Sequence, residues 1–296
     1  MSRKILFIAN PKSRSIDKMD LDSEISRLAE KYNFNWEIYF TLGDNDDQVI
    51  RQKLQKFKPD KVVAVGGDGT INLVASHLIN SKTGLGIIPA GSANGLAFNL
   101  NIPRDIEEAM TIILETEPNP IDVIKINNKS YCLHLCDIGI NARIVKRFED
   151  QDSKGLLGYG KQRIKEFFSE RKIFAFNINT PSMRKRYRAE MIVIANAKSF
   201  GTGAVINPSG LVNDGKFEII IIQPYPMWII FYLLYMSFVG KTDKLKYVKI
   251  ITATEAQIIL DKPHDLQTDG EIIEGLKKIN FEILKSALKV HFILPE

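Results

Sequence analysis

Cysteine is scarce in this 296-residue chain, which contains only Cys132 and Cys136. Two cysteines cannot form the disulfide framework of a small secreted domain, so we expect the protein to work in a reducing compartment. A secretory leader is also missing, because only the five apolar residues at 5–9 precede the polar stretch that begins at Asn10. The core of a signal peptide needs about 7–15 apolar residues. Both absences predict a cytoplasmic protein.

An apolar run long enough to cross a membrane is missing as well. Two prolines divide the longest candidate, 219–239, into a strand and a helix. As a helix, the part at 227–239 would rise about 20 Å, whereas the hydrocarbon core of a bilayer is about 30 Å thick. We expect a buried helix or, because Trp228, Tyr232 and Tyr235 suit an interface, a helix that lies against the bilayer.

Charge of neither sign dominates the chain, whose net charge is +5, but the charge is unevenly placed. Between Lys161 and Arg188 nine Lys and Arg stand against two Glu, so this basic segment carries +7. Such a concentration is a solvated face or binds nucleic acid or an anionic membrane. No nucleic-acid-binding motif accompanies it. Besides the solvated face, the segment therefore favours an anionic membrane surface.

Two patterns of secondary structure divide the chain. In the first part, predicted strands at 4–9, 36–41, 61–65 and 85–88 alternate with predicted helices at 20–32, 46–57 and 71–79 and a helix from about 104. Alternation of this kind predicts an α/β domain with a doubly wound parallel sheet. Prolines at 118 and 120 end the last of these helices, so we place the first domain at 1–121 and the second at 122–285.

Strands dominate the second part and predict a mainly antiparallel domain. They are expected at 123–126, 131–140, 174–179, 189–195, 217–222, 249–252, 256–260, 280–283 and 288–293, with helices at 140–149, 161–170 and 227–239. Cys132, His134 and Cys136 share one face of a predicted strand, which resembles a metal-binding set. Same-face neighbours lie about 6.6 Å apart along a strand, so a buried structural role is the stronger prediction.

Three polar loops follow predicted strands of the first domain, at 10–15, 66–72 and 89–97. The middle loop reads Gly-Gly-Asp-Gly-Thr and opens a helix, where backbone N–H groups attract phosphate and glycine lets the backbone approach a ligand. It lacks the lysine of a Walker A motif. Each loop alone could be an ordinary turn, but ligands of open α/β sheets bind outside the carboxyl ends of the strands. Three such loops together predict a polyphosphate ligand.

The strings Asn-Pro-x-Ser at 10–13, Gly-Gly-Asp-Gly-Thr-x-Asn at 66–72 and Pro-x-Gly-Ser-x-Asn at 89–94 resemble the catalytic region of the diacylglycerol kinase and sphingosine kinase superfamily of lipid kinases. The resemblance continues in order through Asn196, Pro208 and Asp214 to Asp269-Gly270-Glu271. It implies a doubly wound, ATP-binding domain like that of NAD kinase and diacylglycerol kinase and a C-terminal β-sandwich, facing each other across a cleft. The chain end at 286–296 is expected to return to the first domain.

The resemblance also implies the site residues. Asp68 holds Mg²⁺ or orients the nucleotide, and the sequence leaves both roles open. The predicted ATP contacts are Asn10, Pro11, Lys12, Ser13, Arg14, Thr41, Gly66, Gly67, Asp68, Gly69, Thr70, Asn72, Ser92 and Asn94.

Two further sets are expected in the second domain. Asp269 and Glu271 follow an expected turn at 263–265 and can point the same way from an extended chain, so that one can accept a proton while the other holds the metal or orients the first. The resemblance implies that one member of this pair is the general base. It also makes Asp214, with the backbone carbonyls of Leu211 and Lys216, a candidate structural Mg²⁺ site, and a plain turn is the alternative.

The predicted function is that of an ATP- and Mg²⁺-dependent lipid kinase working at the membrane surface. Gly95 stands where many bacterial diacylglycerol kinases have a carboxylate, which keeps both diacylglycerol-like and sphingoid-type lipids as acceptors. An NAD kinase-like enzyme and a nucleotide- and membrane-binding module without turnover are the alternatives. The expected partners are the lipid substrate, an anionic membrane and a second copy of the chain, with no nucleic acid.

Overall fold

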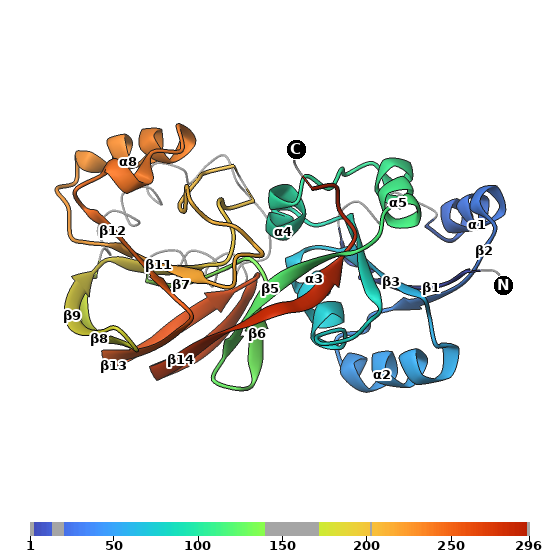
Figure 1. Cartoon of the computed structure of the whole chain (residues 1–296), viewed down its shortest axis with the longest axis horizontal. Helices are drawn as coiled ribbons and strands as arrows, with labels where there is room; N and C mark the ends of the chain where they lie inside the picture. The colour runs from blue at the N-terminus through green and yellow to red at the C-terminus, as the bar shows by residue number, and fades with distance from the viewer. Residues whose placement is uncertain (1–2, 14–20, 140–171, 202, 295–296) are drawn as a thin grey trace, which may run out of the picture. The chain divides into compact units, whose positions relative to one another are not determined.

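A computed structural model describes residues 3–13, 21–139, 172–201 and 203–294 of the chain (Figure 1). The chain forms two compact units. The first comprises 1–123, 212–214 and 284–296, and the second comprises 124–211 and 215–283. The segments at 140–149 and 161–170, and with them the first part of the basic segment, at 161–171, lie outside the described residues.

The first unit is built on a parallel sheet with helices on both faces. Its strands are β1 (Arg3–Ala9), β2 (Phe34–Phe40), β3 (Lys61–Gly66) and β4 (Gly84–Pro89), in the order β4-β3-β1-β2. Its helices are α1 (Leu21–Tyr32), α2 (Asp46–Phe57), α3 (Asp68–Ser76), α4 (Gly95–Asn99) and α5 (Ile106–Glu115). All side chains of 5–9 and 62–65 are buried, as expected for strands covered on both faces.

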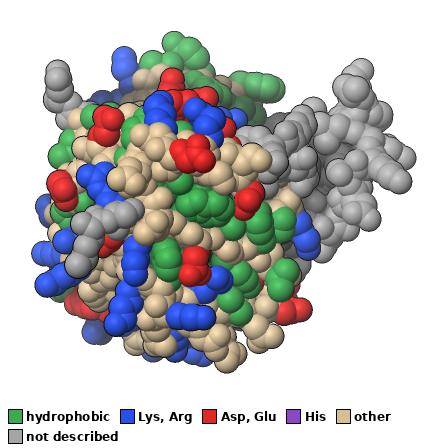
Figure 2. All heavy atoms as spheres, turned by 90° about the vertical axis from the view of Figure 1, so that its right-hand side faces the viewer, with side chains coloured by type: hydrophobic (Ala, Val, Ile, Leu, Met, Phe, Trp, Pro, Cys, Tyr) green, Lys and Arg blue, Asp and Glu red, His purple; other side chains and the backbone are tan. Residues whose placement is uncertain are grey.

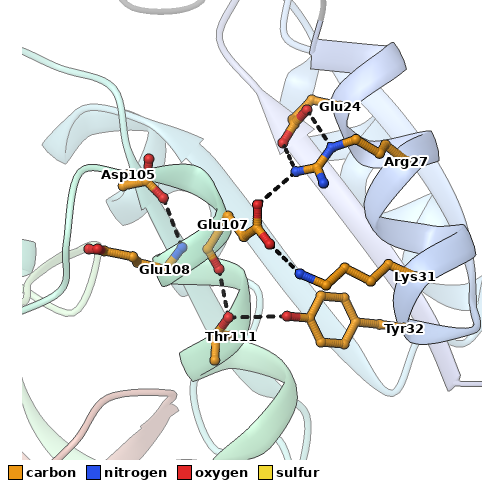
Figure 3. Close-up of polar contacts among 8 residues, drawn as sticks. All are labelled: Glu24, Arg27, Lys31, Tyr32, Asp105, Glu107, Glu108 and Thr111. Atoms are coloured by element: carbon orange, nitrogen blue, oxygen red, sulfur yellow. Dashed lines mark hydrogen bonds and ion pairs between the residues drawn. The ribbon is translucent and has the colours of Figure 1, made fainter.

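Helices α1 and α5 lie on one face of this sheet, and α2 and α3 lie on the other (Figure 1). Figure 3 shows how α1 and α5 meet: Glu107 accepts hydrogen bonds from Arg27, at 2.9 Å, and from Lys31. Tyr32 and Thr111 complete the contact through their hydroxyl groups, 3.3 Å apart. These ion pairs are half exposed and screened by solvent, so they add little stability and serve mainly to set the alignment of the two helices.

The second unit is antiparallel. Its elements are β5 (Asn119–Ile126), which begins in the first unit, β6 (Ser130–Cys132), β7 (Leu135–Gly139), β8 (Phe174–Thr180), β9 (Met183–Ala189), β10 (Met191–Ala195), β11 (Phe217–Ile222), α8 (Ile229–Phe238), the 3-10 turn η1 (Thr242–Lys244), β12 (Val248–Ala253), β13 (Glu255–Thr268) and β14 (Glu271–Val290).

Strand β13 gives this unit its two layers because it changes partners along its length. Its first half, at 257–260, pairs with β8, whereas 266–268 pairs with β7. The register against β14 shifts between Ile259 and His264, which marks the bulge at the change. The aromatic side chains of Phe176, Phe217 and Phe281 fill the core between the layers. The predicted fold class, an α/β domain with a C-terminal β-sandwich, is confirmed.

Several predicted boundaries in the second unit are wrong. The turn expected at 263–265 lies inside β13, where the bulge accommodates Pro263. The expected strand 131–140 is interrupted between Cys132 and Leu135. The strand expected at 189–195 covers the last residue of β9 and the whole of β10. The strand expected at 280–283 lies within β14, and the one expected at 288–293 is the end of the same strand, which stops at Val290. The many charges of β9 concealed its strand character.

Strand β14 ends beside the first unit's sheet. Its Val290 pairs in parallel with Leu85 of β4, and the following His291 N–H donates to the Leu85 carbonyl at 2.9 Å. The residues from Leu284 onward thereby extend the sheet of the first unit.

Candidate active site

The carboxyl ends of four parallel strands meet at one edge of the first unit's sheet. Three backbone hydrogen bonds join the loops there: Asn10 N–H donates to Val65, Thr41 N–H to Ala9 and Ala90 N–H to Gly66, at 2.8–3.0 Å. The predicted ATP contacts at 10–13, 41, 66–72 and 92–94 are therefore brought together at this edge. Arg14 lies outside the described residues.

Two glycines allow the central loops to touch. A Cβ atom on Gly91 would lie 2.4 Å from the Cα of Gly67, and one on Gly67 would lie 3.2 Å from the Cα of Gly91. A Cβ atom on Gly66 would meet the Thr70 hydroxyl at 2.5 Å. No side chain fits at this crossing, so the glycines are required for the loops to pack.

Helix α3 begins in the middle of this edge. Gly67 is its extended N-cap residue, and the first intrahelical bond runs from Ile71 N–H to the Gly67 carbonyl. The N–H groups of 68–70 precede that bond, so they have no partner within the helix and carry the positive end of its dipole. The Asp68 carboxylate is half-buried, and its Oδ1 accepts the Leu96 N–H at 3.3 Å.

Asn94 shapes the loop after β4. Its side chain is buried, its backbone is left-handed, and its amide accepts from Gly91 N–H and donates to the Gly91 carbonyl, both at 2.8 Å. The geometry supports a loop-holding role for Asn94, whereas the exposed Ser92 is the residue that the loop presents to solvent.

The loop after β1 is a compact turn. Ser13 N–H donates to the Asn10 carbonyl at 3.1 Å, and Lys12 N–H donates to the Asn10 side chain at 2.9 Å. Ser13 is buried, Lys12 is exposed and Pro11 is half-buried. In its described part, residues 10–13, the loop therefore offers one cation, Lys12, at the sheet edge.

Sequence reasoning missed Asp46, which holds the loop around Thr41. Its carboxylate accepts from the Tyr39 hydroxyl at 2.6 Å and from the N–H groups of Leu42 and Gly43 at 2.9 Å. Burial raises the pKa of Asp46, but these hydrogen bonds outweigh it and hold the pKa below its ordinary value. Its position at the start of a helix, where acidic residues are favoured, was the available signal.

In the second unit, Asp269 and Gly270 form the two-residue turn between β13 and β14. Thr268 pairs with Glu271 across it, and the positive φ angles of Asp269 (44°) and Gly270 (93°) are those of a type I′ turn. The expectation of an extended chain with two parallel carboxylates is thus wrong. A turn of this type needs positive φ at both central positions, which favours the Asp-Gly sequence seen here.

The two carboxylates have different surroundings. Asp269 is buried, and its oxygens accept the N–H groups of Leu133 at 2.7 Å and His134 at 3.3 Å. Glu271 is exposed at the start of β14. Asp269 therefore fixes the turn to the interruption between β6 and β7, while Glu271 faces solvent.

The interruption between β6 and β7 is held from the other side as well. Asn196 donates its side-chain amide to the Leu133 carbonyl at 2.9 Å and its N–H to the His134 carbonyl at 3.0 Å. The Nε2 atom of His134 lies 2.6 Å from the Ser199 carbonyl. Contacts with residues distant in the sequence thus fix the backbone at Leu133 and His134, to which the turn is bonded.

Gln267 of β13 stabilises the turn through its side-chain amide. With its amide oriented to satisfy both neighbours, it donates to the buried carboxylate of Asp137 at 2.7 Å and accepts from Gly270 N–H at 3.1 Å. Both turn residues are therefore anchored, and Glu271 is presented from a fixed backbone.

Both cysteines lie in the hydrophobic core of the second unit. Both are free and fully buried, and burial raises the pKa of both thiols. No group of three or more His, Cys, Asp and Glu side chains suited to a metal occurs among the described residues. The His134 ring is taken up by Ser199, in line with a structural role.

The candidate cation loop at 211–216 is tied to the first unit through Asp122, whose N–H donates to the Val212 carbonyl at 2.7 Å. Asp214, Leu211 and Lys216 are exposed. A site of one carboxylate and two carbonyls stays a prediction.

Comparisons with known proteins agree with this geometry. Residues 4–126 match the family described as diacylglycerol kinase catalytic domain, and 135–292 match the YegS C-terminal NAD kinase beta sandwich-like domain. The chain belongs to the YegS-like family of lipid kinases. This membership confirms the predicted resemblance and implies the use of ATP.

Relatives align with most of this chain. A protein of Pectobacterium atrosepticum named "probable lipid kinase YegS-like" is 27% identical and aligns with 98% of this chain and 95% of its own. One of Yersinia enterocolitica with the same name is 29% identical, with 78% of each chain covered. A structure described as a diacylglycerol kinase of Bacillus anthracis shares the fold, with a TM-score of 0.73, 20% identity, and coverage of 98% of this chain and 97% of the other.

Proposed function

We propose that this lipid kinase transfers the γ-phosphate of ATP, with Mg²⁺, to the hydroxyl group of a diacylglycerol-like or sphingoid-type lipid at a membrane surface. The convergence of the four strand ends around the start of α3 carries the proposal, because it unites the N–H groups of 68–70 with Asp68 and Lys12. A triphosphate needs such donors and a cation for its charge. The family assignment supports a lipid acceptor over NAD.

The residues at the sheet edge fit a divalent cation. Only Oδ1 of Asp68 is engaged by a hydrogen bond within the described part of the chain, which leaves Oδ2 as a hard oxygen ligand. Mg²⁺ held there would neutralise charge on the phosphates. Asp214 with the carbonyls of Leu211 and Lys216 is proposed as a second, structural site.

Glu271 is proposed as the general base and Asp269 as the residue that positions it. Both oxygens of Asp269 accept backbone N–H groups, whereas Glu271 is exposed. In the reaction the lipid hydroxyl gives its proton to the Glu271 carboxylate, and its oxygen bonds to the γ-phosphorus. The bond from that phosphorus to the bridging β–γ oxygen breaks, and ADP leaves.

A labelled-phosphate assay tests the proposal. The protein is incubated with γ-labelled ATP and Mg²⁺ and, in separate reactions, with diacylglycerol, sphingosine, ceramide or NAD. We expect label in one lipid class and none in NAD. Label in NAD alone would identify an NAD kinase-like enzyme, and absence of ATP consumption with every lipid would leave a binding module without turnover. Each of these results would overturn the proposal.

A further inference from the structure

Helix α8 presents an apolar face to solvent. Its side chains are apolar almost throughout, yet Trp228, Phe231, Tyr235 and Phe238 are 62–72% exposed. Of the fifteen exposed large apolar side chains among the described residues, eight lie within 227–239. Scattered apolar residues are normal on a soluble surface, but a contiguous patch of this kind marks an interaction site.

The exposed side chains form one face. Trp228, Phe231, Tyr232, Tyr235, Phe238 and Val239 follow one another at three- and four-residue spacing, so they lie along a single side of the helix. We call these six residues the α8 apolar face.

The opposite side of α8 is fixed to the second unit. Ile229, Met236 and Ser237 are buried, and the Ser237 carbonyl accepts the Val205 N–H at 2.9 Å. Directly after the helix, Thr242 donates its hydroxyl to the Ile206 carbonyl at 3.1 Å. The helix is thus held in place by its inner side, while the α8 apolar face is exposed and no other described part of the chain buries it.

Four lysines follow this face. Lys241, Lys244, Lys246 and Lys249 are exposed between the end of α8 and the start of β12. Asp243 is the sole acidic residue between 227 and 254. Asp243 pairs with Lys244 at 2.9 Å. By contrast, the face shown in Figure 2 mixes Lys and Arg with Asp and Glu. The segment between α8 and β12 therefore carries a net positive charge.

The positive charge continues onto β9. Lys185 of β9 and Lys249 of β12 both lie over the Tyr187 ring, 5.6 Å from its centroid. Arg184 and Arg188 of the same strand are exposed. Strand β9, which belongs to the described part of the basic segment, thus lies next to Lys249, the last of the four lysines that follow α8.

We propose that the α8 apolar face inserts into the interfacial layer of an anionic bilayer, with Lys241, Lys244 and Lys246 against the lipid headgroups. The proposal deepens the membrane-surface action proposed above and rests on it. Trp and Tyr are suited to this depth because each has an apolar ring and a polar tip. No helix among the described residues has the length and hydrophobicity needed to cross a bilayer, so α8 would lie in the interface plane.

Charge decides against a second copy of the chain as the occupant. In a symmetric contact each copy would bring its α8 apolar face and its adjoining lysines to the same interface. The segment 227–254 supplies only Asp243 as a counter-charge, and Lys244 already occupies it. Anionic headgroups provide the missing negative charge.

Vesicle sedimentation tests the proposal with the full chain. The vesicles contain phosphatidylcholine alone or with a third of phosphatidylglycerol, at low and high salt. Trp228→Ser/Phe231→Ser is compared with the control Ile293→Ser/Leu294→Ser, whose side chains are also more than half exposed. We expect the first variant to lose roughly tenfold or more in binding to both vesicle types and the control to bind like wild type.

A second variant separates the charge from the apolar face. Lys241→Gln/Lys244→Gln/Lys246→Gln should bind anionic vesicles no better than neutral ones, and its binding should no longer depend on salt. Unchanged vesicle binding of Trp228→Ser/Phe231→Ser would overturn the proposal. A second pair of results would also overturn it. The wild type would bind no vesicles, and light scattering would show a wild-type dimer that Trp228→Ser/Phe231→Ser converts to monomers.

Activity on a short-chain form of the lipid class that accepts label, used below its aggregation concentration, distinguishes the two proposals. Docking variants should keep this activity and lose turnover on vesicles. If the wild type bound vesicles through α8 but phosphorylated no lipid in either form, the proposed function would fail while the docking site stood.

Discussion

The two units hold their candidate functional groups in different ways. At the sheet edge of the first unit, the groups lie in loops that directly follow strands. Two of these loops contact each other at Gly67 and Gly91, where no side chain would fit. In the second unit, the turn that presents Glu271 is fixed by contacts across about 135 residues, from Asp269 to Leu133 and His134. A phosphate site can be made from local backbone, whereas a positioned base needs the tertiary fold.

Asp68→Ala is expected to have the largest effect and tests the local half of this comparison. The residue lies in a loop and at the start of α3, so the fold should survive while phosphoryl transfer falls below detection. Labelled-phosphate assays and thermal unfolding measure the two properties. Asp22→Ala, an exposed acid at the start of α1, is the control. A folded Asp68→Ala protein with wild-type turnover would remove this residue from the mechanism.

Glu271→Gln tests the second unit. The amide cannot accept the lipid proton, so kcat should fall by roughly 10²–10⁴ with ATP affinity little changed. Glu274→Gln, an exposed carboxylate on the same strand, should keep wild-type kcat. Full kcat in Glu271→Gln would show that the proton leaves by another route.

Asp269→Asn sharpens the comparison, because it keeps the shape of the side chain and replaces one acceptor with a donor. One of the N–H groups of Leu133 and His134 would then face an N–H₂ group, at a cost of about 1–3 kcal/mol in stability. We expect a lower melting temperature than that of the wild type and a smaller loss of kcat than in Glu271→Gln. The fall of kcat towards acidic pH, which reports protonation of the general base, should remain. Asp265→Asn, whose carboxylate accepts Gly275 N–H in an exposed position, is the control. A loss of kcat equal to that of Glu271→Gln at unchanged stability would instead make Asp269 the base.

The same contrast explains what the sequence could predict. Buried runs such as 62–65 and the glycine-rich loop after them depend on neighbouring residues, so the sheet and its loops could be predicted from periodicity and turn chemistry. The burial of Asp269 depends on residues 132–134, and the strand character of 263–265 depends on pairing with β14. Neither dependence is visible in a local pattern. Strand β9 was missed for the same reason, because β8 provides its pairing.

His291 gives the smallest expected effect, and it concerns the end of β14 in the first unit. Its Nδ1 atom lies 2.9 Å from the Thr116 carbonyl and its Nε2 atom lies 3.4 Å from Nζ of Lys61. Burial, and then the Lys61 charge, lower the pKa of His291 to about 4 from 6.5. Between these values the unfolded chain binds a proton that the folded chain does not, so the free energy of unfolding must fall as the pH falls. The slope from one such group is about 1.4 kcal/mol per pH unit.

Chemical denaturation between pH 5 and 6.5 measures this slope, in a range where carboxylates of ordinary pKa contribute little. In His291→Gln the free energy of unfolding should depend less on pH, because the contribution of one titrating group to the slope is mostly lost. This holds whatever the stability of the variant at neutral pH. Burial also lowers the pKa of His77, opposed by Asp47, so His77→Gln serves as the comparison and should lose a smaller share. If His291→Gln kept the wild-type slope, the ring would already be protonated in the folded chain, and the Lys61 ammonium 3.4 Å away makes that state unfavourable. The acid sensitivity would then have to arise elsewhere than where β14 joins β4.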